Sequence, residues 1–172
     1  NVGLAGVFGT GMKYAEAHGY DMVLQYDGDG QHDPKYIAPM VKQMLKNNAD
    51  IVIGSRYLKE SGKFTLRMAG SFFLRQMIFM TTGKKITDPT SGMRLYGRRM
   101  IRLLGSHINM PPEPDTLAYL IKCGCRIEEV DVRMRERTYG ESYLNFGNSM
   151  RYMANMLVSI LLIHWFREKE VL

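Results

Sequence analysis

A short acidic turn after the first apolar run of the sequence carries the residues best suited to chemistry. The run 22–24 leads into the turn 26–34, which reads Tyr-Asp-Gly-Asp-Gly-Gln-His-Asp-Pro. Asp27 and Asp29 stand two residues apart, and Gln31 adds an amide oxygen. Mg²⁺ and Mn²⁺ prefer oxygen ligands and keep coordination positions open for a partner's phosphate oxygens. The turn therefore predicts a divalent cation site whose partner is a phosphorylated substrate.

Two simpler interpretations of this turn compete with a metal site. Asp and Gly are residues that ordinary turns select, so the segment can be a turn and nothing more. A calcium loop of the EF-hand type begins in a similar way, but it needs Gly at its sixth position and Glu at its twelfth. Counted from Asp27, those positions hold His32 and Ala38, which excludes the EF-hand.

The composition fits one globular domain with a basic balance of charge. The 172 residues are 45% hydrophobic and 23% charged, as in ordinary folded domains. The net charge of +6 favours anionic partners such as nucleotides, phospholipid headgroups and polyprenyl phosphates. The basic residues are dispersed and form no nucleic-acid signature, so no nucleic-acid partner is expected. Cys123 and Cys125 lack a second pair for zinc and are poorly spaced to bridge each other, which indicates reduced packing residues in a cytosolic protein.

The segments on either side of the turn alternate between strand and helix patterns. This order predicts an α/β fold with a mostly parallel sheet, helices on both faces, and ligands at the carboxyl ends of the strands. Arg67 and Arg75 lie among apolar positions of one helical segment, whose simpler interpretation is a helix packed on the core with both arginines solvated. Strands are expected over 22–26, 51–56 and 126–134, and helices over 3–19, 34–47, 64–82, 99–104 and 116–122.

An apolar run near the C-terminus, 153–166, has two interpretations. Its 14 residues are fewer than the roughly 20 that a bilayer-spanning helix needs. Arg151 before the run, with Arg167 and Lys169 after it, could rest on lipid headgroups. A terminal helix that packs on the core explains the same pattern.

Five blocks of sequence, in order, resemble one protein family. The chain is similar to glycosyltransferase family 2, which has the GT-A fold, and within it to dolichol-phosphate mannosyltransferase and bacterial polyprenyl-phosphate glycosyltransferases. The blocks are Asn-Val-Gly at 1–3 with the Gly/Ala helix after it, Asp-Gly-Asp-Gly-Gln-His-Asp-Pro at 27–34, Gly-Ser-Arg-Tyr at 54–57, Asp-Pro-Thr-Ser-Gly-Met-Arg at 88–94 and Glu-Arg-Thr-Tyr-Gly-Glu-Ser at 136–142.

The resemblance implies a domain organisation as well as a fold. Residues 1–150 would form a GT-A catalytic domain, and 151–172 would form an amphipathic helix suited to a membrane surface. Enzymes of this family usually begin with strands and a helix that hold the nucleotide base. We therefore expect the N-terminal strands and helix of the domain to be lacking in this chain, which leaves the donor base and sugar open.

On the donor side, the resemblance implies a metal and a nucleotide-sugar. Asp27, Asp29 and Gln31 would bind Mg²⁺ or Mn²⁺, and both aspartates would help to bind a UDP- or GDP-sugar. Asp29 and Arg137 would be catalytic, because a cation near the diphosphate stabilises the charge that develops as the sugar leaves. The loop of Arg137 contains Gly140 and could close after donor entry. The simpler interpretation of Arg137 is an arginine solvated at the surface.

On the acceptor side, the resemblance implies that Arg56 and Arg67 face an acceptor phosphate and that Ser91 lines the acceptor pocket. Arginine suits this task because its planar guanidinium can bind phosphate through two hydrogen bonds. Asp88 and Arg94 could instead form a structural ion pair within the same turn.

Glu113 occupies the place where many family members keep a catalytic base, with Asp115 close by. A hydroxyl acceptor must lose a proton and benefits from such a base. A phosphate monoester, with a second pKa near ~6, is already an anion at neutral pH, so Glu113 would be dispensable for it. The alternative for this segment is a rigid helix entry with Asp115 as the N-cap.

The sequence as a whole predicts a metal-dependent, inverting glycosyltransferase. It would move a sugar from a nucleotide-sugar to a polyprenyl phosphate, either dolichyl or undecaprenyl, as a cytoplasmic protein that is peripheral at the membrane. Transfer to a sugar hydroxyl in surface polysaccharide synthesis is the alternative enzyme activity. A noncatalytic basic binding module, suggested by the charge of +6, is the alternative of a different class.

Overall fold

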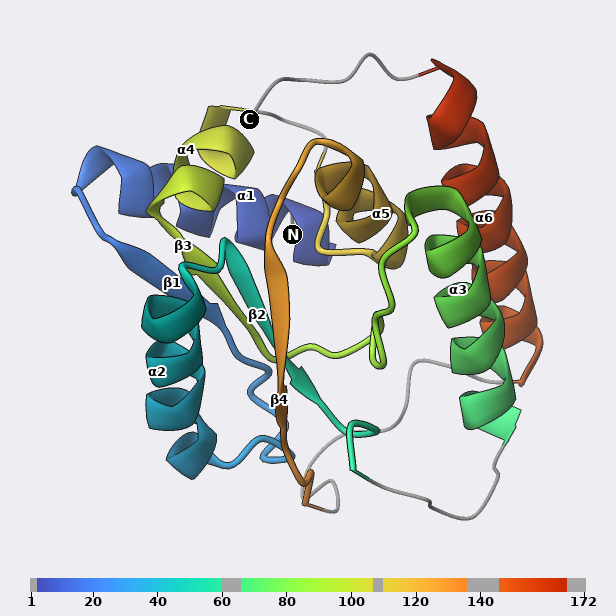
Figure 1. Cartoon of the computed structure of the whole chain (residues 1–172), viewed down its shortest axis with the longest axis horizontal. Coiled ribbons are helices and arrows are strands. Elements are labelled where there is room, and N and C mark those ends of the chain that lie inside the picture. Colours follow the sequence, from blue (N-terminus) through green and yellow to red (C-terminus); the bar gives the residue numbers. More distant parts are fainter. Residues whose placement is uncertain (1–2, 60–65, 107–109, 136–145, 167–172) are drawn as a thin grey trace.

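The computed structural model describes residues 3–59, 66–106, 110–135 and 146–166, which form a four-stranded sheet with helices on both faces (Figure 1). The α/β fold class is confirmed. The strands lie in the order β1-β3-β2-β4. They are β1 (Met22–Gln25), β2 (Ile51–Ser55), β3 (Arg94–Gly97) and β4 (Ile127–Asp131).

The helices follow the expected segments closely. The segment that begins at Pro34 opens as a short 3-10 turn, Pro34–Tyr36, before the α-helix starts at Ile37. The Asp33 carboxylate caps this turn by accepting a hydrogen bond from Lys35 N over 3.1 Å. The helices are α1 (Gly3–Ala17), α2 (Ile37–Asn47), α3 (Leu66–Thr82), α4 (Arg98–Ser106), α5 (Pro114–Lys122) and α6 (Phe146–Phe166).

The two faces of the sheet bury separate apolar clusters. Ile51 and Ile53 point to one side and pack with residues of α1, α4 and α5, whereas Val52 points to the other side and packs against α2. This alternation follows from the two-residue period of a strand. Both faces are covered, which explains why β2 is buried along its whole length.

The prediction of a mostly parallel sheet is only half right. β1, β2 and β4 run in one direction, but β3 lies between β1 and β2 and is antiparallel to both. Among the described strands, only β2 and β4 form a parallel neighbouring pair. Strand direction depends on which strands become neighbours in space, and local sequence patterns do not encode that.

The reversed direction of β3 determines what gathers at one edge of the sheet. The carboxyl ends of β1, β2 and β4 lie at this edge, together with the amino end of β3. The acidic turn that follows β1, Arg56 after β2 and the turn 88–93 before β3 therefore meet there. A ligand-binding edge was expected from the parallel arrangement, and the antiparallel strand adds a further loop to it.

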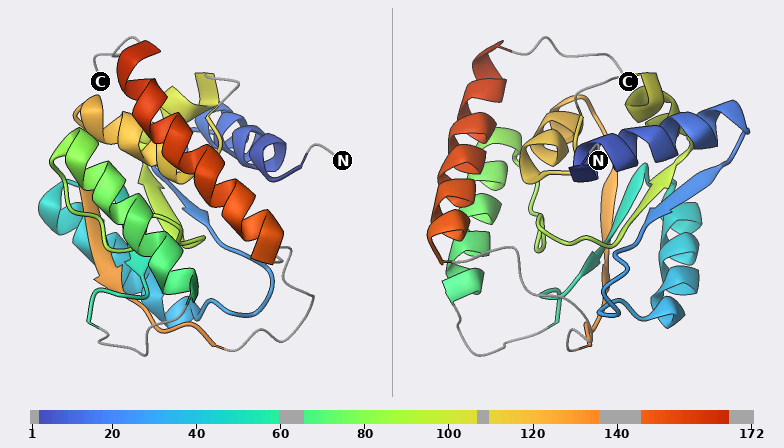
Figure 2. Two further views of the ribbon diagram at one scale, coloured as in Figure 1. Left: turned by 90° about the vertical axis from the view of Figure 1, so that its right-hand side faces the viewer. Right: turned by 180° about the vertical axis from the view of Figure 1, so that it is seen from behind.

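Helices α3 and α6 lie side by side at the outer edge of the molecule (Figure 2). Both contact α5, and Ile160 of α6 is fully buried in the larger cluster. None of the helices in the described part of the chain has the length and hydropathy of a membrane span. Cys123 and Cys125 are free thiols, as predicted.

A substitution at the centre of the sheet tests this packing. Ile53 is fully buried, and Ile53→Ala should lower the free energy of unfolding by about 2–5 kcal/mol, because it removes apolar contacts and leaves a cavity. Val7→Ala, at a position 62% exposed on α1, should change it by less than ~0.5 kcal/mol. Urea unfolding measures both, and equal effects would contradict this account of the core.

Candidate active site

The acidic turn after β1 is held by hydrogen bonds at both ends. Tyr26 Oη donates to the His32 carbonyl oxygen over 2.5 Å, and Gln31 N donates to Asp29 Oδ1 over 3.0 Å. Arg135 N, just after β4, donates to the Gln31 carbonyl oxygen over 2.9 Å. The turn is therefore closed by its own hydrogen bonds and fixed to the segment that follows β4.

Asp27 lies within this turn and touches the neighbouring turn 88–93. Its side chain is 46% exposed, and His32 Nε2 lies 3.6 Å from Asp27 Oδ2. The Asp27 carboxylate also lies against the backbone of Gly92, so closely that a Cβ added at Gly92 would overlap it. The expected donor-side turn and acceptor-side turn are thus in direct contact.

The predicted metal ligands offer the right atoms but not a complete cage. Asp27, Asp29 and Gln31 provide carboxylate and amide oxygens, which suit Mg²⁺ and Mn²⁺. In the part of the chain that the structure describes, no three His, Cys, Asp or Glu side chains are grouped to hold a metal ion. Mg²⁺ is often bound by one or two carboxylates together with substrate phosphates. The residues fit a cation of that kind, whose remaining ligands would come from a substrate.

Arg56 is bound to a buried carboxylate at the end of β2. Its Nε and Nη2 donate to Asp88 Oδ2 and Oδ1 over 2.6 and 2.7 Å, and Nη2 also donates to Thr90 Oγ1 over 2.9 Å. Asp88 is completely buried, whereas the Arg56 side chain remains 20% exposed. The sequence had suggested an ion pair between Asp88 and Arg94. That interpretation is wrong, because Asp88 pairs with Arg56 through two hydrogen bonds. Arg94 instead donates to the carbonyl oxygens of Ser91 and Pro89.

Ser91 lies in the same turn with its side chain turned inward. It is buried, and its hydroxyl donates to the Gly54 carbonyl oxygen over 2.6 Å and accepts from Met93 N over 3.2 Å. The hydroxyl is therefore used to fix the turn to β2. A role in lining the acceptor pocket stays a prediction.

Glu129 of β4 binds the start of the turn 88–93. It was not among the site residues predicted from the sequence. It accepts hydrogen bonds from Thr87 N, Thr87 Oγ1 and Asp88 N at 2.9–3.0 Å. Burial raises the pKa of the Glu129 carboxyl above its ordinary value. A Glu within a strand pattern resembles a solvent-facing residue, and only its partners in space distinguish it.

The guanidinium of Arg75, on α3, is partly buried. The interpretation of Arg75 as a solvated arginine is wrong for two of its nitrogens: Nε and Nη2 are buried and have no hydrogen-bond partner among the described residues. The guanidinium lies 4.6 Å from the centre of the Tyr57 ring, and the Arg56 guanidinium lies 5.2 Å from the same ring. Two cations are therefore close together. The side chain of Arg67 lies outside the described part of the chain.

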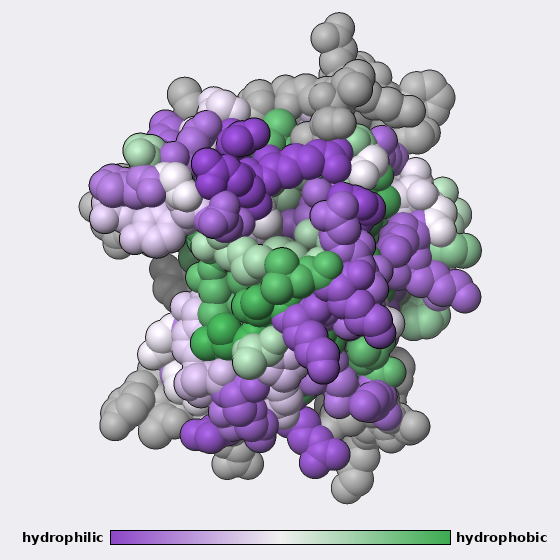
Figure 3. Space-filling view, turned by 60° about the vertical axis from the view of Figure 1, so that its left-hand side comes forward, coloured by the Kyte–Doolittle hydropathy of each residue, from purple (hydrophilic) through white to green (hydrophobic). Residues whose placement is uncertain are grey.

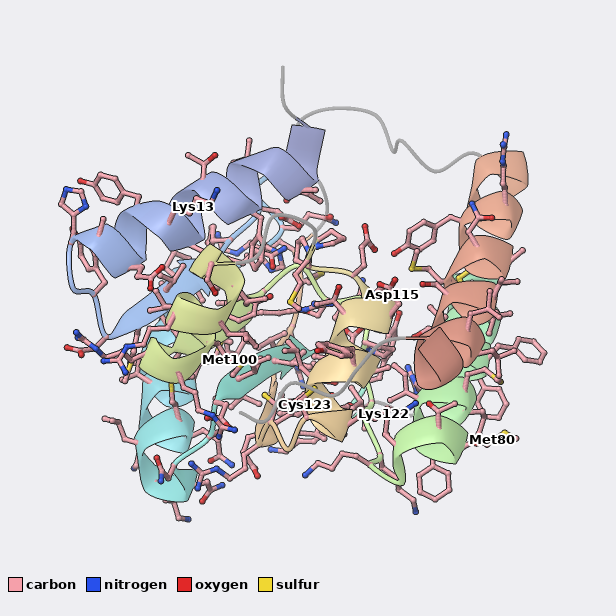
Figure 4. The ribbon with its side chains drawn as sticks, turned by 90° about the horizontal axis from the view of Figure 1, so that it is seen from above. Lys13, Met80, Met100, Asp115, Lys122 and Cys123 are labelled. Carbon is pink, nitrogen blue, oxygen red and sulfur yellow. The ribbon has the colours of Figure 1, made fainter. Side chains whose placement is uncertain are left out.

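The segment around Glu113 is fastened to α6. Tyr152 Oη donates to Glu113 Oε2, and Ser159 Oγ donates to Asp115 Oδ2 over 2.7 Å. Figure 4 shows Asp115 at the start of α5, in the space that faces α6. Asp115 is not the N-cap, because α5 already begins at Pro114, a residue well suited to the first helical position.

Arg137 and the rest of the block 136–142 lie outside the described residues, so their predicted roles stay predictions. The structure brings Asp27, Arg56 and Ser91 to one edge of the sheet. Glu113 is placed by its contact with α6 instead.

Comparison with known proteins gives a family match and several relatives. The profile described as "Glycosyl transferase family 2" matches residues 1–105. The UDP-N-acetylglucosamine–dolichyl-phosphate N-acetylglucosaminyltransferase of Methanococcus voltae is 30% identical over 63% of this chain and 44% of its own length. The undecaprenyl-phosphate mannosyltransferase of Micrococcus luteus is 29% identical over 84% of this chain and 62% of its own length.

An uncharacterised protein of Methanocaldococcus jannaschii is 27% identical over 83% of this chain and 61% of its own length. The chain thus spans between 44% and 62% of these three relatives. The matched residues 1–105 include the acidic turn, Arg56 and the turn 88–93, which meet in the structure.

The raised pKa of Glu129 leads to a pH-dependent prediction. The folded protein holds this proton more tightly than the unfolded chain, so the contribution to stability is present at low pH and lost as the pH rises through the folded-state pKa. As the pH rises above 4.5, the ordinary glutamate value, the unaltered protein should lose stability relative to Glu129→Gln.

Urea unfolding of both proteins from about pH 4 to about pH 8 measures this difference. Glu128→Gln, the neighbouring position of the same strand, is the control for removing one negative charge from β4. A difference between Glu129→Gln and the unaltered protein that stays constant with pH would contradict the prediction.

Proposed function

Because this chain belongs to glycosyltransferase family 2, we propose that it transfers a sugar from a nucleotide-sugar donor to a polyprenyl phosphate. The observation that carries this proposal is the contact between the acidic turn and the turn that holds Arg56, through Asp27 and Gly92. Oxygen ligands for a cation and a fixed guanidinium thus lie at one edge of the sheet. The helix-flanked sheet is consistent with a GT-A-like fold.

On the donor side, Asp27, Asp29 and Gln31 would hold Mg²⁺ or Mn²⁺. The cation, when bound, would neutralise the charge of the donor diphosphate. Hydrogen bonds from Tyr26 and Arg135 keep the turn in place and so reduce the cost of ordering it when the donor binds. Arg137 would add a positive charge at the leaving diphosphate.

On the acceptor side, Arg56 would bind the phosphate of the polyprenyl chain, with Arg67 and Ser91 as further predicted contacts. The Asp88 carboxylate fixes the Arg56 guanidinium in a single orientation. Nearby Arg75 adds a second positive charge and two buried donors that have no partner in the described part of the chain. An anion supplied by the acceptor would satisfy this excess of positive charge, and it would need no carboxylate base, so Glu113 would be dispensable.

The names of two relatives support a lipid-linked acceptor. The protein of Methanococcus voltae is named for dolichyl phosphate and that of Micrococcus luteus for undecaprenyl phosphate. Such acceptors reside in membranes, so the protein should work at a membrane surface, which we place on the cytoplasmic side.

The outer face of α3 and α6 suits contact with an anionic lipid surface. Neither helix contains Asp or Glu, and exposed Lys84 and Lys85 follow α3. Basic residues at the edge of an apolar helical face favour the interface of an anionic bilayer. Met80 points away from the body of the molecule (Figure 4). The exposed apolar residues of this face are Phe72, Phe73, Phe79 and Met80 on α3 and Val158, Leu161 and Leu162 on α6.

The donor site can be tested by calorimetry. UDP and GDP are titrated into the purified protein with Mn²⁺ and with a chelator. We expect one nucleotide to bind only with Mn²⁺, and Asp29→Asn to weaken that binding at least about tenfold, because it removes a charged oxygen ligand.

Asp21→Asn is the matched control. It removes the same charge from a side chain that is 80% exposed and paired with Arg98 away from the turn. Nucleotide binding that ignores Mn²⁺, or equal losses in the two variants, would count against the proposed donor site.

The lipid-binding face can be tested with vesicles. Phe73→Glu and Met80→Glu place a charge where the side chain is 59% or 74% exposed. Each should weaken sedimentation with vesicles rich in phosphatidylglycerol at least about tenfold, because a charged side chain opposes burial in the interface.

Leu45→Glu on α2, at a position 68% exposed, supplies the same change on another face and should leave vesicle binding intact. Equal vesicle binding by all three variants would mean that the α3–α6 face is not a lipid-binding surface. Failure of the unaltered protein to sediment with the vesicles would mean the same.

A further inference from the structure

Gly92 stands where a side chain has no room. A Cβ built on it would lie 2.9 Å from Asp27 Cγ and 3.2 Å from Asp27 Oδ1, and closer still to Oδ2. Packed atoms rarely approach so closely without displacement. The Asp27 carboxylate therefore occupies the space that any other residue at position 92 would fill.

The backbone at Gly92 has little freedom to retreat. On one side, the Ser91 hydroxyl donates to the Gly54 carbonyl oxygen over 2.6 Å. On the other side, Gly54 N donates to the Met93 carbonyl oxygen over 2.9 Å, and Met93 is fully buried. Because both neighbours are fixed to β2, a larger residue at position 92 must displace the Asp27 side chain or break these bonds.

Backbone conformation does not explain this glycine. Gly19, Gly30, Gly83 and Gly124 have positive φ angles, which favour glycine, but Gly92 does not belong to that group. Position 92 thus requires glycine for a steric reason, because the Asp27 carboxylate fills the space that a Cβ would occupy.

A second residue approaches the same carboxylate. His32 Nε2 lies 3.6 Å from Asp27 Oδ2, and the His32 side chain is 2% exposed. Among the described residues His32 Nδ1 has no hydrogen-bond partner although it is buried, so the position of the ring costs free energy. The Asp27 carboxylate is confined by a glycine from the turn 88–93 and by an imidazole from its own turn.

We propose that Gly92 is a positioning residue that fixes the Asp27 carboxylate in the orientation needed for the cation of the donor. This rests on the proposed function, in which Asp27 is a metal ligand. The turn 88–93, which Arg56 and Glu129 hold in place, thereby sets the geometry of the donor side. A substitution in this turn would therefore shift the Asp27 carboxylate and weaken cation binding, although every metal ligand is unchanged.

The contact can be tested independently of metal binding by a double-mutant cycle in urea unfolding. Gly92→Ala should lower the urea midpoint. The loss should be at least halved in an Asp27→Ala background, where the carboxylate that the new Cβ meets is gone. An equal loss in both backgrounds would mean that Gly92 serves the turn alone, and it would overturn the proposal.

Metal affinity tests the consequence for function. Mn²⁺ is titrated in the presence of whichever of UDP or GDP binds. Gly92→Ala should weaken Mn²⁺ affinity at least about tenfold, a change of about 1.4 kcal/mol. Gly11→Ala, an exposed helical position where a new Cβ meets nothing within 4 Å, should leave the affinity unchanged.

The outcomes separate the two proposals. If the unaltered protein binds no Mn²⁺, the proposed donor site is wrong and the positioning role falls with it, although the unfolding cycle still decides whether Gly92 and Asp27 are in contact. If the unaltered protein binds Mn²⁺ and Gly92→Ala binds it equally well, the donor site stands and the positioning role is overturned.

Discussion

The ion pair between Arg56 and Asp88 is the interaction on which the rest of the site depends. Asp88 is fully buried, and a buried carboxylate without its partner would be strongly destabilising. The pair fastens the turn 88–93 to the end of β2, and Glu129 binds the backbone of the same turn from β4. Gly92 then meets Asp27 at a fixed place. A single buried charge pair therefore links Arg56, at the end of β2, to Asp27, in the turn after β1.

Much of this arrangement could be predicted from the sequence, for reasons that are physical. The helices and the strands β1, β2 and β4 have clear apolar periods, and Asp27, Asp29 and Gln31 lie in the turn where they were expected. Strand β3 was not expected at all, because its four residues are too few for a clear period, and its direction arises from pairing in space. Glu129 and the inward hydroxyl of Ser91 were missed for a related reason: their roles are defined by partners 41 and 37 residues away in the sequence.

Two features of α6 show why a sequence pattern can support opposite interpretations. The helix packs on α3 and α5, as a core-packing terminal helix should, and Ile160 is buried. It also exposes Val158, Leu161 and Leu162 on its outer side, as a lipid-facing helix should. The two interpretations of the apolar run are therefore compatible, since one face of the helix packs on the core and the opposite face is exposed. Through Tyr152 and Ser159, this helix also reaches the segment that carries Glu113.

Strand β1 lies at the edge of the four-stranded sheet. Within the described residues it pairs on one side only, with β3, and all four of its residues are partly exposed. Figure 3 shows an apolar area, bordered by hydrophilic residues, on the side of the molecule that comes forward from the left of Figure 1, where β1 and α2 lie. Unpaired backbone groups beside an apolar area form a template for adding another strand. Among the described residues, the free side of β1 is therefore the place where a further strand could add to the sheet.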